Sequence, residues 1–431
     1  MKFAFYTLGC KVNQCETQAM ERRVLELGHT LGAWTEPCDG YIINTCTVTA
    51  VSDKKSRGAI RRARRTSPGA VVGVCGCYAQ VSPGDIRRLG ADVLAGTAER
   101  MAFLDAVVEE AARRERTRRE LWEQAALHRD FERLAAGGLA TRTRAMLKVQ
   151  DGCRNFCSYC IIPYARGPLR SLPLAEAAGQ ARAAAAAGYR ELVVTGIEIS
   201  SWGADLPGTP PLRDLAAAVC AAAPELRVRL GSLEPRTVTE DFCAALAALP
   251  NLCPQFHLSL QSGCDSVLRR MRRRYDTARY LESVRLLRRF FPGCAVTTDL
   301  IVAFPGESEA EFQESLRFLE TCAFAQVHVF PYSRRAGTPA ARMPGQLGNA
   351  VKAERAAQAL EAAARLNRQY REGLLGSVQE VLFEQAAGAY FTGHARNYIP
   401  VAVPAADLHN QVRRVEITGL LGDGLLGRLA D

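Results

Sequence analysis

Short apolar runs alternate with helical stretches along most of the 431 residues of this chain, and this alternation narrows the possible folds. Over residues 1–110 the runs KFAFYTLG, GYIINTC, AVVGVCG and ADVLAG predict strands, and the stretches between them predict helices. Strands that are separated by helices of this length pair in parallel. The loops at the carboxyl ends of such strands form the ligand crevice of the sheet. The sequence therefore predicts a parallel α/β domain in this part of the chain.

The alternation resumes after residues 111–140, a charge-dense segment that we expect to be a mainly helical linker ending in AAGG. Six more strand candidates follow: AMLKVQDG, ELVVTGIEIS, RVRLGSLEP, QFHLSLQSG, AVTTDLIVAFPG and AQVHVFPYS. Helical stretches separate most of them, and this predicts a partial (βα)6 barrel over residues 141–367. In residues 368–431, short alternating strands with Gly turns predict a small β-barrel. The predicted fold class is α/β with this third, all-β region.

The chain carries fifteen cysteines but no sign of export. No apolar run reaches the roughly 18 residues that span a membrane. The amino-terminal run is too short for a signal peptide and lacks a small-residue cleavage site. We therefore expect a cytoplasmic protein with no membrane partner, in which cysteines are thiols, metal ligands or catalytic groups rather than disulfides.

The formal net charge is +10, and cationic side chains cluster at residues 53–65, 112–119 and 269–274. Clustered arginines and lysines favour a polyanionic partner, most simply nucleic acid. A solvated helix face explains any single cluster equally well.

Three cysteines form a tight group within DGCRNFCSYCIIPYARG, residues 151–167. Cys153, Cys157 and Cys160 follow the spacing C-x3-C-x2-C, and no fourth cysteine lies at a similar distance. Structural zinc sites take four ligands, and electron-transfer [4Fe–4S] clusters usually take four cysteines. Three thiolates leave one iron of a [4Fe–4S] cluster open for substrate, and the Tyr159 ring suits a position over such a cluster. The alternative is a buried thiol cluster without metal.

This motif, with an aromatic residue before its third cysteine, resembles the signature of the radical S-adenosylmethionine superfamily, whose fold is a partial barrel. The resemblance implies that the open iron binds S-adenosylmethionine and that the reduced cluster cleaves it to a 5′-deoxyadenosyl radical. It also implies a cofactor pocket at the ends of the barrel strands. The candidate cofactor contacts are Tyr159, Gly196, Glu234 and Gln261. For the last three, an N-cap or loop-shaping role is the alternative.

Three further motifs, TLGCKVNQCETQ, NTCTVT and GCYAQ, each place a cysteine where a predicted strand ends: Cys10, Cys46 and Cys77. Because strand-end loops of one parallel sheet converge, these thiolates can share a cluster. Together the motifs resemble the amino-terminal domain of the methylthiotransferases. That resemblance implies another [4Fe–4S] cluster, whose open iron carries the sulfur to be inserted. Cys15 and Cys75 are alternative ligands, but Cys75 alternates with apolar residues inside a predicted strand.

The stretches TLGCKVNQ and GCRNFCSYCIIPYARGPLRS are most similar to the branch that adds a methylthio group to C2 of N6-threonylcarbamoyladenosine at tRNA position 37. The discriminating residues are Lys11, Val12 and Asn13, because the isopentenyladenosine branch typically reads GCQMN and the ribosomal-protein branch GCPKN. Those two substrates remain alternatives, as does a non-catalytic RNA-binding iron–sulfur protein. The resemblance implies two [4Fe–4S] clusters, S-adenosylmethionine as methyl donor and radical source, the tRNA anticodon stem-loop, an electron donor and a sulfur source.

The carboxyl-terminal stretch GAYFTGHARNYIPVAV resembles a TRAM domain, an RNA-binding β-barrel, and a generic barrel with core aromatics is the alternative. Arg166 and Arg170, just beyond the cysteine loop, are candidates to meet the carboxylate of the threonylcarbamoyl group. We expect the remaining cysteines to be packing thiols. They are Cys38, Cys220, Cys243, Cys253, Cys264, Cys294 and Cys322.

Overall fold

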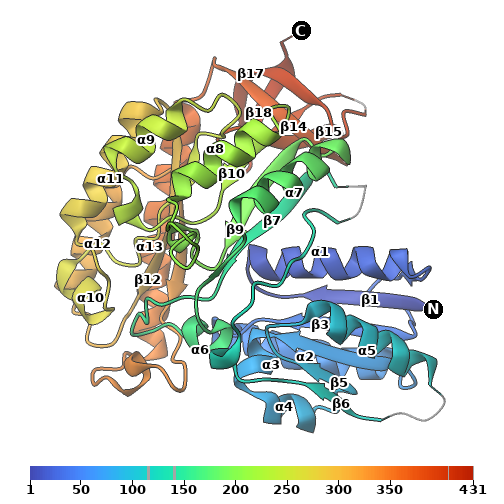
Figure 1. The fold of residues 1–431 in the computed structure, drawn as a ribbon. Coiled ribbons are helices and arrows are strands. Elements are labelled where there is room, and N and C mark those ends of the chain that lie inside the picture. The colour runs from blue at the N-terminus through green and yellow to red at the C-terminus, as the bar shows by residue number, and fades with distance from the viewer. Residues whose placement is uncertain (114–116, 139–141, 406, 431) are drawn as a thin grey trace.

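The computed structural model describes residues 1–113, 117–138, 142–405 and 407–430, which form three regions (Figure 1). Residues 114–116, within the predicted linker and the basic cluster at 112–119, lie outside the described residues, as do 139–141 at the predicted start of the barrel, 406 and 431. No helix in the described part of the chain is both long and apolar enough to cross a membrane.

The amino-terminal region is a six-stranded sheet in the order β2-β1-β3-β4-β5-β6, and every pairing is parallel. Its strands are β1 (Lys2–Thr7), β2 (Thr30–Leu31), β3 (Gly40–Thr45), β4 (Val71–Gly76), β5 (Val93–Ala95) and β6 (Arg119–Leu121). Its helices are α1 (Lys11–Glu26), α2 (Ala50–Thr66), α3 (Cys77–Val81), α4 (Pro83–Arg88) and α5 (Arg100–Ala112). Strands β3 and β4 are buried at every position because α1 and α5 cover one face of the sheet and α2, α3 and α4 cover the other. The predicted parallel α/β arrangement is confirmed.

The expectation of a mainly helical linker over residues 111–140 is wrong for the residues that the structure describes. Helix α5 ends at Ala112, and β6 adds a sixth parallel strand beside β5. One short 3-10 turn, η1 (Ala125–Leu127), follows. The charge-dense composition favours a helix locally, but the open edge of β5 offers backbone hydrogen bonds that outweigh this preference. Trp122 then donates from Nε1 to the Gln80 carbonyl (3.1 Å) and fixes the chain beyond β6.

The middle region contains all six strands that the sequence predicts. They are β7 (Arg144–Asp151), β9 (Glu191–Gly196), β10 (Arg227–Leu230), β11 (Gln255–His257), β12 (Ala295–Val302) and β13 (Gln326–Pro331). One sheet runs β10-β9-β7-β8, with β8 (Arg170–Ser171) antiparallel to β7, and the other runs β11-β12-β13. Parallel bridges from Val228 to Leu252 and from Leu233 to Leu258 join the two sheets into one arc. This arc is the predicted partial barrel.

Helices on the outside of the arc close its core. They are α7 (Leu174–Ala186), α8 (Leu212–Ala222), α9 (Glu240–Ala247), α10 (Asp265–Arg270), α11 (Thr277–Phe290), α12 (Glu309–Cys322) and α13 (Asn349–Glu372). The 3-10 turns η2 (Ile199–Ser201), η3 (Pro235–Thr237) and η4 (Pro339–Arg342) lie in the connections, and α6 (Ile162–Arg166) packs against α3 and η1. On α7 the buried residues Ala177, Ala181 and Ala184 follow helical spacing and face the strands. The alanine-rich stretches are therefore core helices of the barrel.

The carboxyl-terminal region is a small closed barrel, as predicted, in the order β14-β15-β16-β18-β17. Its strands are β14 (Val378–Ala387), β15 (Tyr390–Ala395), β16 (Pro400–Val403), β17 (Val412–Leu421) and β18 (Gly424–Leu429). It packs on the starts of β7 and β10: Arg144 pairs with Glu384 (2.8 Å), and Arg229 donates to the Arg396 carbonyl (2.9 Å). These contacts bring residues 397–399 to the barrel interior.

Candidate active site

Cys10, Cys46 and Cys77, the first cysteine group, each follow the carboxyl end of a strand. Cys10 is the N-cap of α1 after β1, Cys46 comes directly after β3, and Cys77 begins α3 after β4. These three strands are neighbours, so the structure brings the cysteines together as the parallel arrangement predicts. Burial raises the pKa of the Cys77 thiol to about 12, although Arg166 opposes the rise. Cys10 and Cys46 raise it further, so the three thiols interact electrostatically.

Two glycines allow the loops of this group to approach one another. Gly9 has a φ of +103°, and a Cβ placed there would lie 2.8 Å from Cβ and 2.9 Å from Sγ of Cys46. Gly76 has a φ of +96°, and its Cβ would lie 2.5 Å from the Thr45 carbonyl oxygen. Only a residue without a side chain fits both this backbone and this space.

The second cysteine group, Cys153, Cys157 and Cys160, occupies the loop between β7 and α6. The Cys160 amide donates to the Cys157 carbonyl (3.0 Å), which tightens this loop. All three residues line a cavity of about 590 Å³ inside the barrel, and Cys10 of the first group lines the same cavity. The cavity reaches Gln326 at the start of β13 and is also lined by residues 397–399 of the small barrel.

The four candidate cofactor contacts line this cavity as well: Tyr159, Gly196, Glu234 and Gln261. A Cβ on Gly196 would lie 2.8 Å from Oε1 of Gln150, so no side chain fits at the end of β9. Gln261 holds a left-handed backbone (φ 69°), which non-glycine residues rarely adopt. Glu234 caps η3 by accepting from the Arg236 amide, so the alternative N-cap role is also real for this residue.

Arg273 is a residue of this site that sequence reasoning missed. Its Nη1 donates to the sulfur of Cys157 (3.2 Å), and its Nε donates to the Tyr275 hydroxyl (2.9 Å). In the sequence it belongs to the cationic run at 269–274, which resembles a surface patch. Arg273 is half-buried and contacts Cys157, so this arginine of the run points inward.

Three neighbouring strands add a polar strip to the cavity wall, which sequence reasoning also missed. His257 of β11 lies 3.4 Å from the Asp299 carboxylate of β12 and 3.1 Å from the Thr297 hydroxyl. His328 of β13 lies beside them, with its ring centroid 6.1 Å from that of His257. The signal was present in the sequence, because QFH, TTD and QVH each place polar residues two apart, on one face of a strand.

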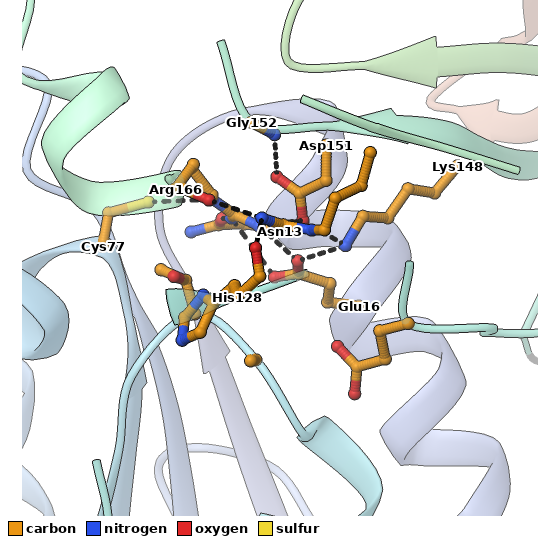
Figure 2. Close-up of polar contacts among 12 residues, drawn as sticks. Asn13, Glu16, Cys77, His128, Lys148, Asp151, Gly152 and Arg166 are labelled. Atoms are coloured by element: carbon orange, nitrogen blue, oxygen red, sulfur yellow. Dashed lines mark hydrogen bonds and ion pairs between the residues drawn. The ribbon is translucent and has the colours of Figure 1, made fainter. Parts of the chain in front are cut away.

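A buried ionic network joins the two cysteine groups (Figure 2). The Arg166 guanidinium points toward Cys77 on one side and toward Asn13 and Glu16 of α1 on the other. Its Nε donates to the Cys77 sulfur (3.3 Å), its Nη2 to Oδ1 of Asn13 (2.5 Å) and its Nη1 to Asp151 (3.2 Å). Asn13 in turn donates to the carbonyls of Leu8 and Thr45, which precede the loops of Cys10 and Cys46. Arg166 and Asn13 therefore connect all three loops of the first group.

The carboxylates of this network are ionised because cations surround them. Burial opposes the ionisation of Glu16, but Arg100, Arg166 and Lys148 hold the pKa of its carboxyl well below the ordinary value. Lys148 donates to Glu16 (3.1 Å) and pairs with Asp151 (2.6 Å). The network thus ties α1 of the amino-terminal region to β7 and α6 of the barrel.

The expectation that Arg166 and Arg170 meet a substrate carboxylate is wrong. Arg166 is fully buried, and Arg170 is 4% exposed. Arg170 donates to the carbonyls of Arg166 (3.1 Å) and Pro168 (3.0 Å), and it lies 3.5 Å from Asp151. Carboxylates and backbone carbonyls of the protein itself therefore occupy both guanidinium groups.

The other cysteines are buried, as expected of packing thiols: Cys38, Cys220, Cys243, Cys253, Cys264, Cys294 and Cys322. Cys75 lies in the apolar core between β4 and α5 and is fully buried there. Cys15 is buried between α1 and β7 and contacts the Met146 carbonyl (3.6 Å). The alternative assignment of Cys15 or Cys75 as a ligand therefore has no support in the geometry.

Comparisons with known proteins place this site in a family. Residues 2–96 match the model of "Uncharacterized protein family UPF0004", and residues 147–319 match that of the "Radical SAM superfamily". Threonylcarbamoyladenosine tRNA methylthiotransferase MtaB of Bacillus subtilis is 38% identical over 421 residues, which are 96% of this chain and 93% of that protein. MtaB of Chlamydia pneumoniae is 35% identical over 98% of this chain and 97% of its own length. The tRNA-2-methylthio-N(6)-dimethylallyladenosine synthase of Symbiobacterium thermophilum is 32% identical over 88% of this chain and 83% of its own.

Among solved structures, the radical S-adenosylmethionine methyltransferase TsrM of Kitasatospora setae has a similar fold, with a TM-score of 0.54 at 16% identity over 90% of this chain and 79% of that one. Both cysteine groups lie in segments that match the two family models. The identity to the MtaB proteins extends over nearly the whole chain, the small barrel included. The chain therefore belongs to the family of radical S-adenosylmethionine methylthiotransferases of the MtaB type.

Proposed function

We propose that this protein adds a methylthio group to C2 of N6-threonylcarbamoyladenosine at position 37 of tRNA, next to the anticodon. The observation that carries this proposal is that one cavity inside the barrel is lined by all three cysteines of the second group and by Cys10 of the first. The MtaB protein of Bacillus subtilis, 38% identical, bears the name of this activity. The cavity volume of about 590 Å³ lies within the usual range for small-molecule sites.

The donor chemistry of both groups fits a [4Fe–4S] cluster. Each group offers three thiols, and among the described residues the cysteines that line the cavity all belong to these groups: Cys10, Cys153, Cys157 and Cys160. Three thiolates leave one iron open for a substrate, whereas an electron-transfer cluster held by four cysteines has no open iron. Cys153, Cys157 and Cys160 would hold the cluster that, with S-adenosylmethionine, supplies a 5′-deoxyadenosyl radical. The first group would hold the cluster that carries the sulfur.

The protein's own residues position these groups and exclude water. Tyr159, within the second cysteine loop, packs against the apolar cluster that contains Met271 and Phe304, and burial raises the pKa of its hydroxyl well above the ordinary value. Arg166 and Arg273 each donate a hydrogen bond to one cysteine sulfur, Cys77 and Cys157 respectively. Gly196 leaves the backbone at the end of β9 open to the cavity, and a Cβ there would lie 2.9 Å from Cβ of Gln150 and from Cγ2 of Ile199. We assign S-adenosylmethionine to this end, between Gly196, Glu234 and Gln261.

Helix α2 supplies a cationic surface for the tRNA backbone. Lys54, Lys55, Arg61 and Arg62 are exposed on it, and it begins four residues after Cys46. Val48, between that cysteine and the helix, lines the cavity. Phosphates bound along α2 would therefore bring the anticodon loop to the cavity mouth. In the small barrel, Arg428 is paired with Glu416 (2.8 Å), so this arginine does not add to a cationic surface. Support for RNA binding by the small barrel comes from its fold and from the residues 397–399 that it contributes to the cavity wall.

The reaction also requires a low-potential electron donor and a source of sulfur, and a tRNA substrate supports our expectation of a cytoplasmic protein. Nucleoside mass spectrometry of bulk tRNA from cells that lack this protein, and from complemented cells, tests the proposal. Loss and recovery of 2-methylthio-N6-threonylcarbamoyladenosine is expected. Loss of the isopentenyl analogue instead would keep the family and overturn the substrate. No change in either nucleoside would overturn the tRNA activity and favour a ribosomal-protein substrate.

A further inference from the structure

Lys11 occupies an unusual position, directly after Cys10 at the first turn of α1, with its side chain on the cavity wall. Among the described residues its ammonium has no hydrogen-bond or ion-pair partner. Among the described residues that line the cavity, Arg273 is the one further lysine or arginine, and its guanidinium already donates to Cys157 and Tyr275. Lys11 is therefore a cation that the protein alone does not neutralise.

The surroundings of Lys11 favour an anion. The Lys11 side chain is exposed in the cavity, and the charged groups that act on it are the cations Arg229 and Arg144 and the anion Glu191. Glu191 is already bound by Arg227 (2.6 Å) and Arg229 (2.9 Å), and Arg144 is bound by Glu384. An incoming carboxylate would relieve the repulsion among these cations and gain a charge-assisted hydrogen bond.

Strand β13 contributes two polar side chains to the same wall. Gln326 and His328 are two residues apart, so they point to one face of the strand, and both are accessible from the cavity. Burial lowers the pKa of His328, the Asp299 carboxylate opposes this, and His257 and Lys11 lower the pKa further, so Lys11 lies within electrostatic reach of His328. The remaining histidine and acidic side chains that line the described wall are His257 and Asp299 beside His328, and Glu198 and Glu234 near η2 and η3.

We propose that Lys11, with Gln326 and His328, forms a subsite that binds the carboxylate of the threonylcarbamoyl substituent of adenosine. A carboxylate takes a cation and hydrogen-bond donors, whereas the apolar isopentenyl group takes neither, so this subsite selects between the two nucleosides. Because Lys11 follows Cys10, a substrate bound here lies beside the first cysteine group. This assignment rests on the proposed function and names the part of the site that recognises its substrate.

Equilibrium binding of full-length, anaerobically reconstituted protein to two anticodon stem-loop RNAs tests the subsite. One RNA carries N6-threonylcarbamoyladenosine at position 37, and the other carries the methyl ester of the same group, which lacks the negative charge. For wild type we expect about tenfold tighter binding of the acid than of the ester, as the loss of one charge-assisted hydrogen bond predicts. Lys11→Met should abolish this preference, and Lys11→Arg should restore most of it.

Lys54→Gln on α2 is the matched control, because it removes a lysine from the proposed phosphate surface. It should weaken binding of both RNAs by the same factor and keep the preference for the acid. Iron content and far-UV circular dichroism show that each variant is folded and loaded. An unchanged preference in Lys11→Met would overturn the subsite. A wild type that binds both RNAs but modifies neither would overturn the proposed function instead, so the two failures are distinguishable.

Discussion

The Nε atom of Arg166 donates a hydrogen bond to the sulfur of Cys77 across 3.3 Å. Arg166 lies in α6, six residues after Cys160, whereas Cys77 begins α3 of the amino-terminal sheet. The contact therefore links the loop of the second cysteine group to a member of the first. Arg273 makes a comparable contact with Cys157 at 3.2 Å. Each proposed cluster thus has one arginine that donates to one of its sulfur ligands.

Arg166→Lys keeps the positive charge beside Glu16 and Asp151 but removes the Nε donor to Cys77. A donor to a cluster sulfur stabilises the reduced state, so its loss should lower the reduction potential of the first cluster. A redox titration, monitored by electron paramagnetic resonance, measures this shift in reduction potential. Arg273→Lys is the matched control, since it should lower the potential of the second cluster alone. Equal potentials in wild type and Arg166→Lys would rule out this tuning role.

Gly9→Ala should reduce cluster binding by the first cysteine group, because the new Cβ would lie 2.8 Å from Cβ of Cys46. Gly28 has a similar positive φ of +78° but open space around it, so Gly28→Ala separates backbone strain from the steric clash. We expect Gly28→Ala to lower the free energy of unfolding by about 1 kcal/mol and to leave the iron content unchanged. Iron and sulfide analysis after anaerobic reconstitution measures both variants. Full iron content in Gly9→Ala would show that the loops tolerate a wider separation.

Cys157→Ala should abolish the formation of 5′-deoxyadenosine, because two thiolates do not hold an open cluster. Cys46→Ala should leave this cleavage largely intact and stop insertion of the methylthio group. Liquid chromatography of 5′-deoxyadenosine and mass spectrometry of the RNA nucleosides distinguish these outcomes. Loss of both activities in Cys46→Ala would argue against separate roles for the two groups.

Glu191 should make stability depend on pH where the barrel meets the small barrel. Burial opposes its ionisation, but Arg229 and Arg227 hold the pKa of its carboxyl at about 2, below the ordinary value of 4.5. A depressed folded-state pKa stabilises the protein above the unfolded-state value, and this contribution is lost as pH falls from about 4.5 toward 2. Its full size is about 3 kcal/mol at neutral pH.

Urea unfolding at a series of pH values measures this dependence. Between pH 5 and pH 3 the free energy of unfolding of wild type should fall more steeply than that of Glu191→Gln. Parallel slopes for the two proteins would contradict the ion-pair assignment.

Much of the fold follows from the sequence because periodicity and strand order are local signals. The runs that end at Cys10, Cys46 and Cys77 are parallel strands, and parallel strands bring their carboxyl ends to one edge. Strand β4 ends at Gly76, so Cys75 lies inside the strand and faces the core, whereas Cys77 lies beyond the strand at the start of α3.

The remaining features depend on partners that are distant in sequence. Arg166 is bound by Glu16, 150 residues earlier, and no local sequence pattern predicts a buried partner at that separation. Strand β6 has three residues, too few for a period to be recognised, and only the open edge of β5 defines it. The inward-facing polar residues of β11, β12 and β13 were readable from their spacing of two, once those strands were known to be neighbours.

The central claim is that two open clusters face one cavity, and metal analysis tests it most directly. Anaerobically reconstituted wild type should bind about eight irons per chain, since each [4Fe–4S] cluster contributes four. The triple alanine variant of Cys10, Cys46 and Cys77 should bind about four, and so should that of Cys153, Cys157 and Cys160. Mössbauer spectra should show [4Fe–4S] signals in all three proteins. About four irons in the wild type, or a loss of all iron in either triple variant, would contradict the two-cluster account.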